Sequence, residues 1–114
     1  MKFQELKKSL TNGCKPIYLI EGEDAFLRGN ALRLLKTAFL KEEALNLTNY
    51  SGQEVKENSE EFFNAVYSYP FMSDKRFVIL NEYYPTLTEL KNNKFKTLFK
   101  EPVETTVVIF VNSS

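Results

Sequence analysis

The sequence predicts a single α/β domain in which a parallel sheet is covered by helices on both faces, giving three layers. Four short apolar runs alternate with amphipathic segments, which is typical of parallel strands joined by crossover helices. One of these runs, at 77–80, is apolar at every position, as expected for a strand covered on both faces. With 114 residues, the chain has the length of one small domain with its own core.

Composition excludes several classes of function. Apolar residues make up 43% of the chain and charged residues 26%, which is ordinary for a soluble globular domain. Fifteen basic and fifteen acidic residues cancel, so no global charge attracts nucleic acid or a membrane. The absence of His and the single Cys14 exclude the usual zinc sites, although oxygen-only metal binding stays open. The lone thiol favours a reducing, cytoplasmic compartment, and no apolar run approaches the ~20 residues of a membrane span.

The first half of the chain contributes two helices and one strand. Residues 1–10 are predicted to be a helix. Its apolar residues at helical spacing are Phe3, Leu6 and Leu10. Residues 17–20 form the first strand, and a long helix follows from about Asp24, whose side chain caps the first amides, to near Lys41. The apolar face of this helix carries Phe26, Leu32, Leu35 and Phe39.

The middle of the chain contributes an edge strand and a third helix. Residues 45–50 begin by alternating apolar with polar, which favours a half-exposed edge strand, and the Ser-Gly pair at 51–52 turns the chain. The helix begins with a cap at Asn58, followed by acidic residues in its first turn. It ends by Tyr69, because Pro70 disfavours a helical residue before it. The side chains predicted to point inward are Phe62, Phe63, Val66 and Tyr67.

Two further strands complete the predicted sheet, at 77–80 and 107–111. Between them, a capping box from Thr86 to Glu89 opens a helix. The apolar residues of that helix are Leu87, Leu90, Leu98 and Phe99. The chain stops three residues after the last strand, with nothing to cover the outer flank of that strand. We therefore expect residues 1–114 to be a fragment of a longer protein.

The segment LIEGEDAFLRGNALRLL runs from a strand into a helix, as a phosphate-binding loop does. In the Walker pattern G-x-x-x-x-G-K-S/T, backbone amides surround the phosphates, the Lys neutralises them and the hydroxyl binds magnesium. Gly22 matches the first glycine. Leu27, Arg28 and Gly29 then occupy the places of the second glycine, the lysine and the hydroxyl residue. Of the chemistry of the Walker motif, only the positive charge of the lysine is kept, by Arg28. Leu27 is disfavoured wherever the loop needs a positive φ. The carboxylates at 23–24 repel phosphate.

A second incomplete motif follows the apolar run at 77–80. In P-loop ATPases such a strand ends in Asp-Glu, where the Asp organises magnesium and the Glu assists hydrolysis. Here the strand ends in Asn81 and Glu82, so a neutral amide takes the place of the metal-organising carboxylate. The two motifs together predict a degenerate nucleotide site, with no catalytic residue, no metal and no cofactor.

The combination of MKFQELKKSL, IYLIEGEDAFLR and SYPFMSDKRFVILNE resembles the N-terminal domain of the delta subunit of bacterial DNA polymerase III. The resemblance covers essentially all 114 residues. It implies an ATPase-like domain of the AAA+ class that lacks a working nucleotide site, has strand order 2-3-4-1, and is followed by two further domains. It also implies the function of a clamp loader: the subunit binds the β sliding clamp and helps to open the ring for loading onto primed DNA. Other loader subunits, gamma or tau and delta prime, are implied as partners, and DNA is contacted through the complex.

The resemblance also implies a clamp-binding element, which maps onto Tyr69, Pro70, Phe71 and Met72. Phe71 is the expected anchor, with Met72 beside it and the two preceding residues as shaping or rim residues. Because the proline ends the helix, Phe71 and Met72 follow on a short turn and need not face the sheet. The polar rim is expected at 74–76. The alternative is that both apolar residues pack under the turn as ordinary core.

Two other functions stay open at this stage. A divergent ATPase or GTPase would use Arg28 and Glu82 in unorthodox roles. A DNA-binding module would use Lys91, Lys94, Lys96 and Lys100. Successive helical residues turn by about 100°, so these four lysines spread around a helix, which favours a solvated face.

Overall fold

The computed structural model describes residues 13–85 and 87–113. The helix predicted over 1–10 and the capping residue Thr86 lie outside the described residues. In chain order the elements are β1 (Ile17–Glu21), α2 (Ala25–Phe39), α3 (Glu43–Asn46), β2 (Leu47–Ser51), α4 (Gly52–Glu57), α5 (Ser59–Val66), β3 (Arg76–Asn81), α6 (Leu87–Leu90), α7 (Asn93–Lys100) and β4 (Thr106–Asn112). In the part of the chain that is described, no helix has the length and apolar character needed to cross a membrane.

The strands of the described residues form one parallel sheet in the order β1-β4-β3-β2. This is the predicted order 2-3-4-1 read from the opposite edge, and β2 is the predicted edge strand. The last strand is central: Val108 lies opposite Ile17 of β1 on one side and Val78 of β3 on the other. The expectation that the flank of the last strand is uncovered is therefore wrong, because β1 pairs with that flank.

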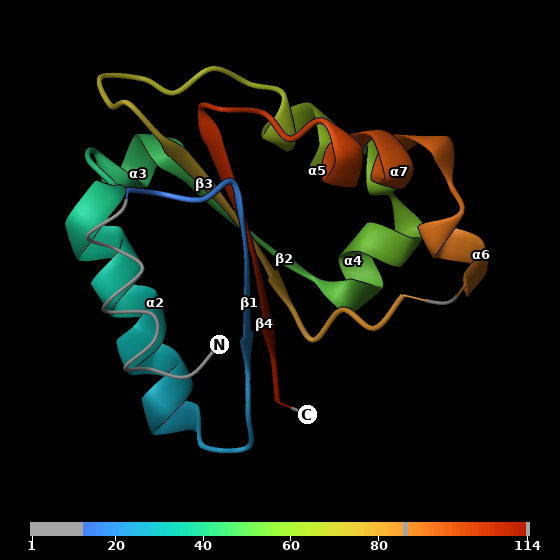
Figure 1. Cartoon of the computed structure of the whole chain (residues 1–114), viewed down its shortest axis with the longest axis horizontal. Helices are drawn as coiled ribbons and strands as arrows, with labels where there is room; N and C mark the ends of the chain where they lie inside the picture. The colour runs from blue at the N-terminus through green and yellow to red at the C-terminus, as the bar shows by residue number, and fades with distance from the viewer. Residues whose placement is uncertain (1–12, 86, 114) are drawn as a thin grey trace.

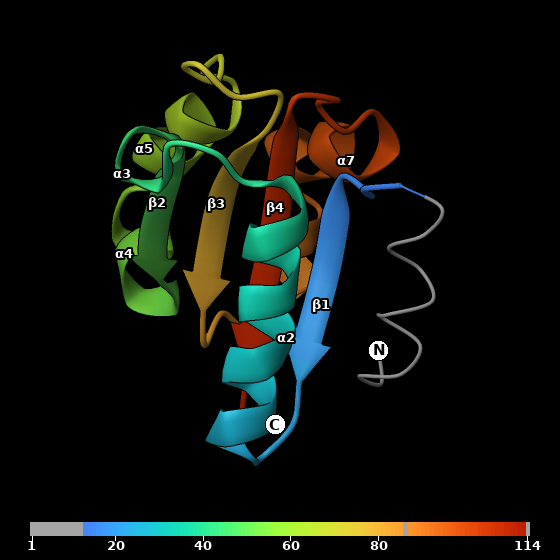
Figure 2. The ribbon, with the colours of Figure 1, turned by 90° about the vertical axis from the view of Figure 1, so that its left-hand side faces the viewer.

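Helices cover both faces of the sheet, as predicted (Figures 1 and 2). α2 lies across one face, whereas α4, α5 and α7 cover the other. Residues 77–80 of β3 contribute to the cores on both faces of the sheet, because successive side chains of a strand point to opposite faces. Phe77 and Ile79 pack with Leu35 of α2, and Val78 and Leu80 belong to the opposite core. All four side chains of 77–80 are fully buried, as the apolar run predicts.

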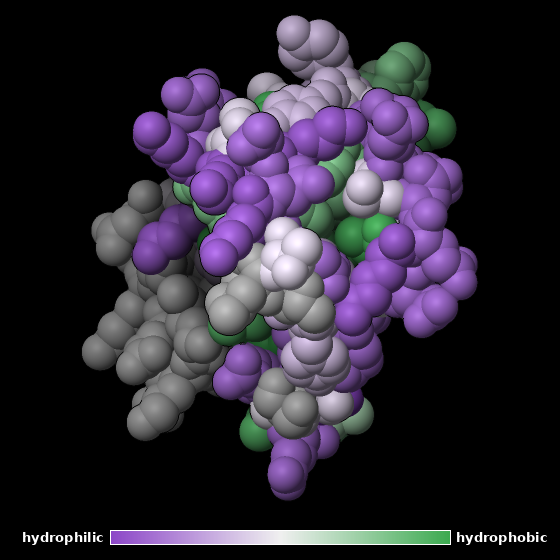
Figure 3. All heavy atoms as spheres, turned by 90° about the vertical axis from the view of Figure 1, so that its right-hand side faces the viewer, coloured by the Kyte–Doolittle hydropathy of each residue, from purple (hydrophilic) through white to green (hydrophobic). Residues whose placement is uncertain are grey.

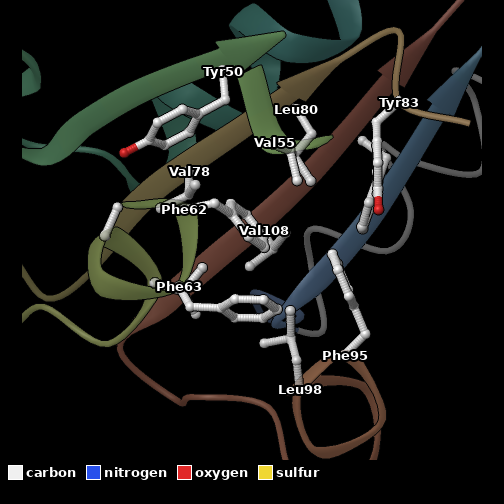
Figure 4. Packing of buried hydrophobic residues seen from close by; sticks show 13 residues of the cluster. Tyr50, Val55, Phe62, Phe63, Val78, Leu80, Tyr83, Phe95, Leu98 and Val108 are labelled. Atoms are coloured by element: carbon white, nitrogen blue, oxygen red, sulfur yellow. The ribbon is translucent and has the colours of Figure 1, made fainter. Parts of the chain in front are cut away.

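The core on the α5 and α7 side is built around aromatic rings (Figure 4). Phe95 of α7 stacks on Phe62 of α5, with ring centroids 6.0 Å apart, and on Tyr83, with centroids 5.8 Å apart. Burying each such ring contributes roughly 1.5 to 3 kcal/mol. Phe95 therefore joins α7 to α5 and to the segment that follows β3.

The helical layers differ from the prediction at several points. The Ser-Gly pair at 51–52 begins α4, and its serine forms a capping box with Glu54. The helix expected between 86 and 99 is divided into α6 and α7. The second part starts anew because Asn92 Oδ1 accepts from the Lys94 N–H at 2.8 Å. The short helix α3 was not predicted, and no side-chain cap is found at the start of α5.

Three aromatic residues predicted to point inward are substantially exposed. The exposed fractions are 73% for Phe26, 50% for Tyr67 and 44% for Phe99. Phe26 lies in the first turn of α2, and Tyr67 lies just beyond the last residue of α5. Phe99 stacks on Phe110 at 6.1 Å, which covers one side of its ring. Helical periodicity gives the direction of a side chain, but it does not say how far the opposing layer extends.

Gly52 allows the start of α4 to approach the backbone that follows β3. A Cβ atom at this position would lie 2.3 Å from the carbonyl oxygen of Glu82 and 3.0 Å from Cα of Tyr83. Because both neighbours are backbone atoms, we expect Gly52→Ala to force these segments apart and to lower the free energy of unfolding by about 2 kcal/mol or more. The midpoint of urea denaturation measures this change.

Gly29→Ala is the matched control, because a Cβ atom at Gly29 meets nothing within 4 Å. In the interior of α2 this substitution should stabilise the protein by roughly 0.5 to 1 kcal/mol. An unchanged midpoint for Gly52→Ala would contradict the close approach.

Candidate functional site

The predicted site residues lie at opposite ends of the sheet (Figure 1). Gly22 follows the carboxyl end of β1, and Asn81 and Glu82 end and follow β3. The segment 69–72 precedes β3 and lies at the amino end of the strands. The fold therefore separates the degenerate nucleotide motifs from the predicted clamp-binding residues.

The loop between β1 and α2 is short. α2 begins at Ala25, so Leu27 is a helical residue and the expected penalty for positive φ does not arise. Asp24 caps this helix: its Oδ1 accepts from the N–H of Phe26 at 2.9 Å and from that of Leu27 at 3.4 Å. In a Walker loop, amides at this place face a phosphate. Here they are bonded to a carboxylate of the chain itself.

Arg28 and Glu82 are also held within this end of the sheet. A guanidinium nitrogen of Arg28 donates to the carbonyl oxygen of Gly22. The Glu82 carboxylate accepts from the hydroxyl of Tyr84, and from the N–H and hydroxyl of Ser113, both at 3.0 Å. The bond from Tyr84, then those from Ser113, and the nearby Arg28 charge lower the pKa of Glu82 below its ordinary value. Glu82 thus joins the end of β3 to the end of β4, and Arg28 joins α2 to the loop after β1.

Asn81 stands where P-loop ATPases have the metal-organising aspartate, and its amide bonds within the fold. Its Nδ2 donates to the carbonyl oxygen of Tyr50 and to Oδ1 of Asn49, each at 3.4 Å. Among the described residues, no group of three His, Cys, Asp or Glu side chains is placed to hold a metal ion.

The segment 69–72 presents apolar side chains to solvent. The exposed fractions are 86% for Tyr69, 58% for Phe71 and 73% for Met72, whereas Pro70 is half-buried. α5 ends at Val66, before Tyr69, as predicted. The alternative that Phe71 and Met72 pack under the turn as core is wrong, because both side chains are mostly exposed.

The backbone of this segment is fixed although its side chains are exposed. The Phe71 N–H donates to Asn46 Oδ1 at 2.6 Å, and Asn46 Nδ2 donates to the Phe71 carbonyl oxygen at 2.6 Å. Ser73 Oγ accepts from the N–H groups of Lys41 and Lys75, both at 3.3 Å. Met72 lies between these two hydrogen-bonded points and has a φ of 54°, in the left-handed region. The exposed side chains are therefore carried by a defined loop.

Asn46 was missed by sequence reasoning. The alternation of 45–50 predicts that its side chain faces solvent, yet it is fully buried at the end of α3. The local sequence offers one sign that this asparagine is buried: it stands between two apolar residues, Leu45 and Leu47. Its partner Phe71 is distant in sequence, so the pairing is set by the tertiary fold.

Two of the predicted polar rim residues make structural contacts. Lys75 Nζ donates to the carbonyl oxygen of Glu104 at 2.5 Å. The Arg76 guanidinium donates to the carbonyl oxygen of Ala65 and to Thr48 Oγ1, each at 2.9 Å. Arg76 therefore ties β3 to α5 and β2. Asp74 is exposed.

The lysines of the DNA-binding alternative do not share one helix. Lys91 lies in the break between α6 and α7, and the other three lie on α7. Lys94 Nζ lies 4.0 Å from a carboxylate oxygen of Glu60 and 5.7 Å from the ring centroid of Phe63. The surface over these helices is mostly hydrophilic (Figure 3). The lysines are part of a mixed, solvated face.

The chain matches known proteins in both sequence and structure. Residues 18–113 match the sequence model of the family described as DNA polymerase III, delta subunit. The structure is similar to the Bacillus subtilis DNA clamp loader delta protein, with a TM-score of 0.77 and 17% identity, covering 97% of this chain and 36% of that chain. It is also similar to a DNA polymerase III gamma subunit-related protein from Thermotoga maritima, with a TM-score of 0.65 and 17% identity, covering 99% of this chain and 39% of that chain. A comparison with curated proteins finds no match.

The hydrogen bonds of Asp24 lead to a prediction about stability. Asp24→Ala removes the side-chain acceptor for two amides at the start of α2. We expect a loss of about 1 kcal/mol in the free energy of unfolding, the usual cost of losing an N-cap. Urea denaturation measures it, with Glu23→Ala as the control that removes a neighbouring exposed carboxylate. Equal effects of the two substitutions would contradict the capping role.

Proposed function

The chain belongs to the DNA polymerase III delta-subunit family, and from this premise we propose that it is the AAA+-like N-terminal domain of a clamp-loader subunit. In this proposal the domain binds the β sliding clamp and helps to open the ring for loading onto primed DNA. It works beside the gamma or tau and delta prime subunits, and DNA is contacted through the whole complex. The chain spans 36% and 39% of the two solved relatives, so these activities concern a larger assembly.

The observation that carries the proposal is the exposure of Phe71 and Met72 on a fixed loop. An aromatic ring and a thioether that enter a partner's pocket each contribute roughly 1.5 to 3 kcal/mol. The unbranched Met side chain adapts to the shape of a pocket. The hydrogen bonds of Asn46 hold the Phe71 backbone before binding, so less entropy is lost on association.

The carboxyl end of the sheet supports a non-catalytic role. Asp24 occupies the amides at the start of α2, and Asn81 supplies a neutral amide where magnesium needs a carboxylate. The ATPase-like scaffold then serves for shape and for docking among related subunits. Nucleotide hydrolysis belongs to neighbouring subunits with intact sites.

The proposal predicts that the chain does not bind nucleotide. ATP at millimolar concentration with magnesium should give no saturable heat in calorimetry and no thermal shift. The reason is that the carboxylates at 23–24 repel phosphate and Asp24 competes for the helix amides. An intact P-loop ATPase in the same buffer is the positive control. A micromolar dissociation constant would support the divergent ATPase or GTPase instead.

The proposal also predicts that Phe71 is the main anchor for the clamp. Phe71→Ala should weaken binding to the cognate clamp by roughly 2 kcal/mol, about thirtyfold, as for a truncated hot spot. Because the side chain is 58% exposed, the unfolding midpoint should change little. Calorimetric titration of the clamp and urea denaturation of the same variant measure the two quantities.

Phe26→Ala is the matched control, since this phenylalanine is 73% exposed at the opposite end of the sheet. It should leave clamp affinity unchanged. If Phe71→Ala lowers stability but not affinity, the anchor assignment fails and Met72 is the next residue to test. If the unaltered chain does not retain the clamp in a pull-down, the proposed function itself fails.

A further inference from the structure

The Asn46 side chain binds the backbone of two other segments. Besides its two bonds with Phe71, its Nδ2 lies 3.0 Å from the carbonyl oxygen of Lys41 and 3.2 Å from that of Glu42. These carbonyls belong to the connection between α2 and α3. The side chain is fully buried, so water does not replace a lost bond without rearrangement of the fold.

The two bonds with Phe71 fix the orientation of that residue as well as its place. The amide oxygen of Asn46 pairs with the Phe71 N–H, and the amide nitrogen pairs with the carbonyl oxygen of the same residue. A rotation of the loop about Phe71 breaks at least one of these bonds and leaves a buried polar group without its partner. The direction in which the exposed ring leaves the surface therefore depends on Asn46.

We infer that Asn46 is a positioning residue, which holds Phe71 ready for the clamp without touching the clamp itself. This inference rests on the proposed function. Without Asn46 the loop samples several orientations, and binding has to select the competent one. The cost appears as weaker affinity.

A second asparagine provides an internal control. Asn112 accepts from the Tyr83 N–H at 3.1 Å and donates to the Tyr83 carbonyl oxygen at 3.2 Å. It is also buried, but it lies at the carboxyl end of the sheet. Asn112→Ala removes the same kind of paired bond, and so matches the loss of stability, at a place remote from Phe71.

The first experiment is a double-mutant cycle on clamp affinity. We expect Asn46→Ala to weaken clamp binding about tenfold. Asn112→Ala should stay within about twofold of the unaltered chain. If Asn46 acts through Phe71, the double variant Asn46→Ala with Phe71→Ala binds no more weakly than Phe71→Ala alone. Full additivity of the two losses, or an unchanged affinity for Asn46→Ala, would overturn the inference.

The second experiment is independent of the clamp. Amide hydrogen exchange should show protection at Phe71 in the unaltered chain. In Asn46→Ala exchange at Phe71 should become at least about tenfold faster while exchange at Tyr83 is unchanged, and Asn112→Ala should give the reverse. A Phe71 amide that exchanges without protection in the unaltered chain overturns the inference, even if Asn46→Ala does not fold. If the chain binds no clamp but shows this exchange pattern, the proposed function is wrong, while the role of Asn46 in fixing the loop is supported.

Discussion

The burial of β3 and β4 on both faces is the constraint on which the rest of the structure depends. Residues 77–80 are fully buried, and every residue of β4 is buried. A parallel sheet needs apolar cover on both faces, which the crossover helices supply. With both faces closed, the two ends of the sheet are where loops reach solvent. The polar and the exposed apolar features considered as sites lie at those ends.

The two ends of the sheet fix a loop in the same way, but one loop buries its aromatic side chain and the other exposes it. At each end, a buried asparagine amide holds the backbone of a residue in a distant loop: Asn112 holds Tyr83, and Asn46 holds Phe71. The Tyr83 ring then turns into the core, whereas the Phe71 ring remains exposed. Fixing a backbone is thus separate from burying its side chain. The amino end uses this separation to present apolar groups in a defined arrangement.

Sequence reasoning succeeded where a feature depends on local pattern. The apolar runs predicted the strands, and Asp24 and Pro70 marked the start and the end of helices. The strand order came from the family resemblance, because a pattern of alternation does not order strands. The short helices α3 and α4 were missed, since one overlaps an alternating run and the other begins at a Ser-Gly pair. The exposure of Phe71 depends on what lies above the loop, and phenylalanine is more often buried, so the sequence left both alternatives open.

The central place of β4 has a consequence for folding. β4 follows β1, β2 and β3 in the chain, yet it separates β1 from β3 in the sheet. Until Thr106 to Asn112 leave the ribosome, the edges of β1 and β3 that pair with β4 present unpaired backbone groups. The pairing of Ile17 with Val108 brings together residues far apart in the sequence, which makes this step slow relative to formation of the local helices. Nascent chains therefore pass through a period of exposure to aggregation that ends only when β4 pairs with both β1 and β3.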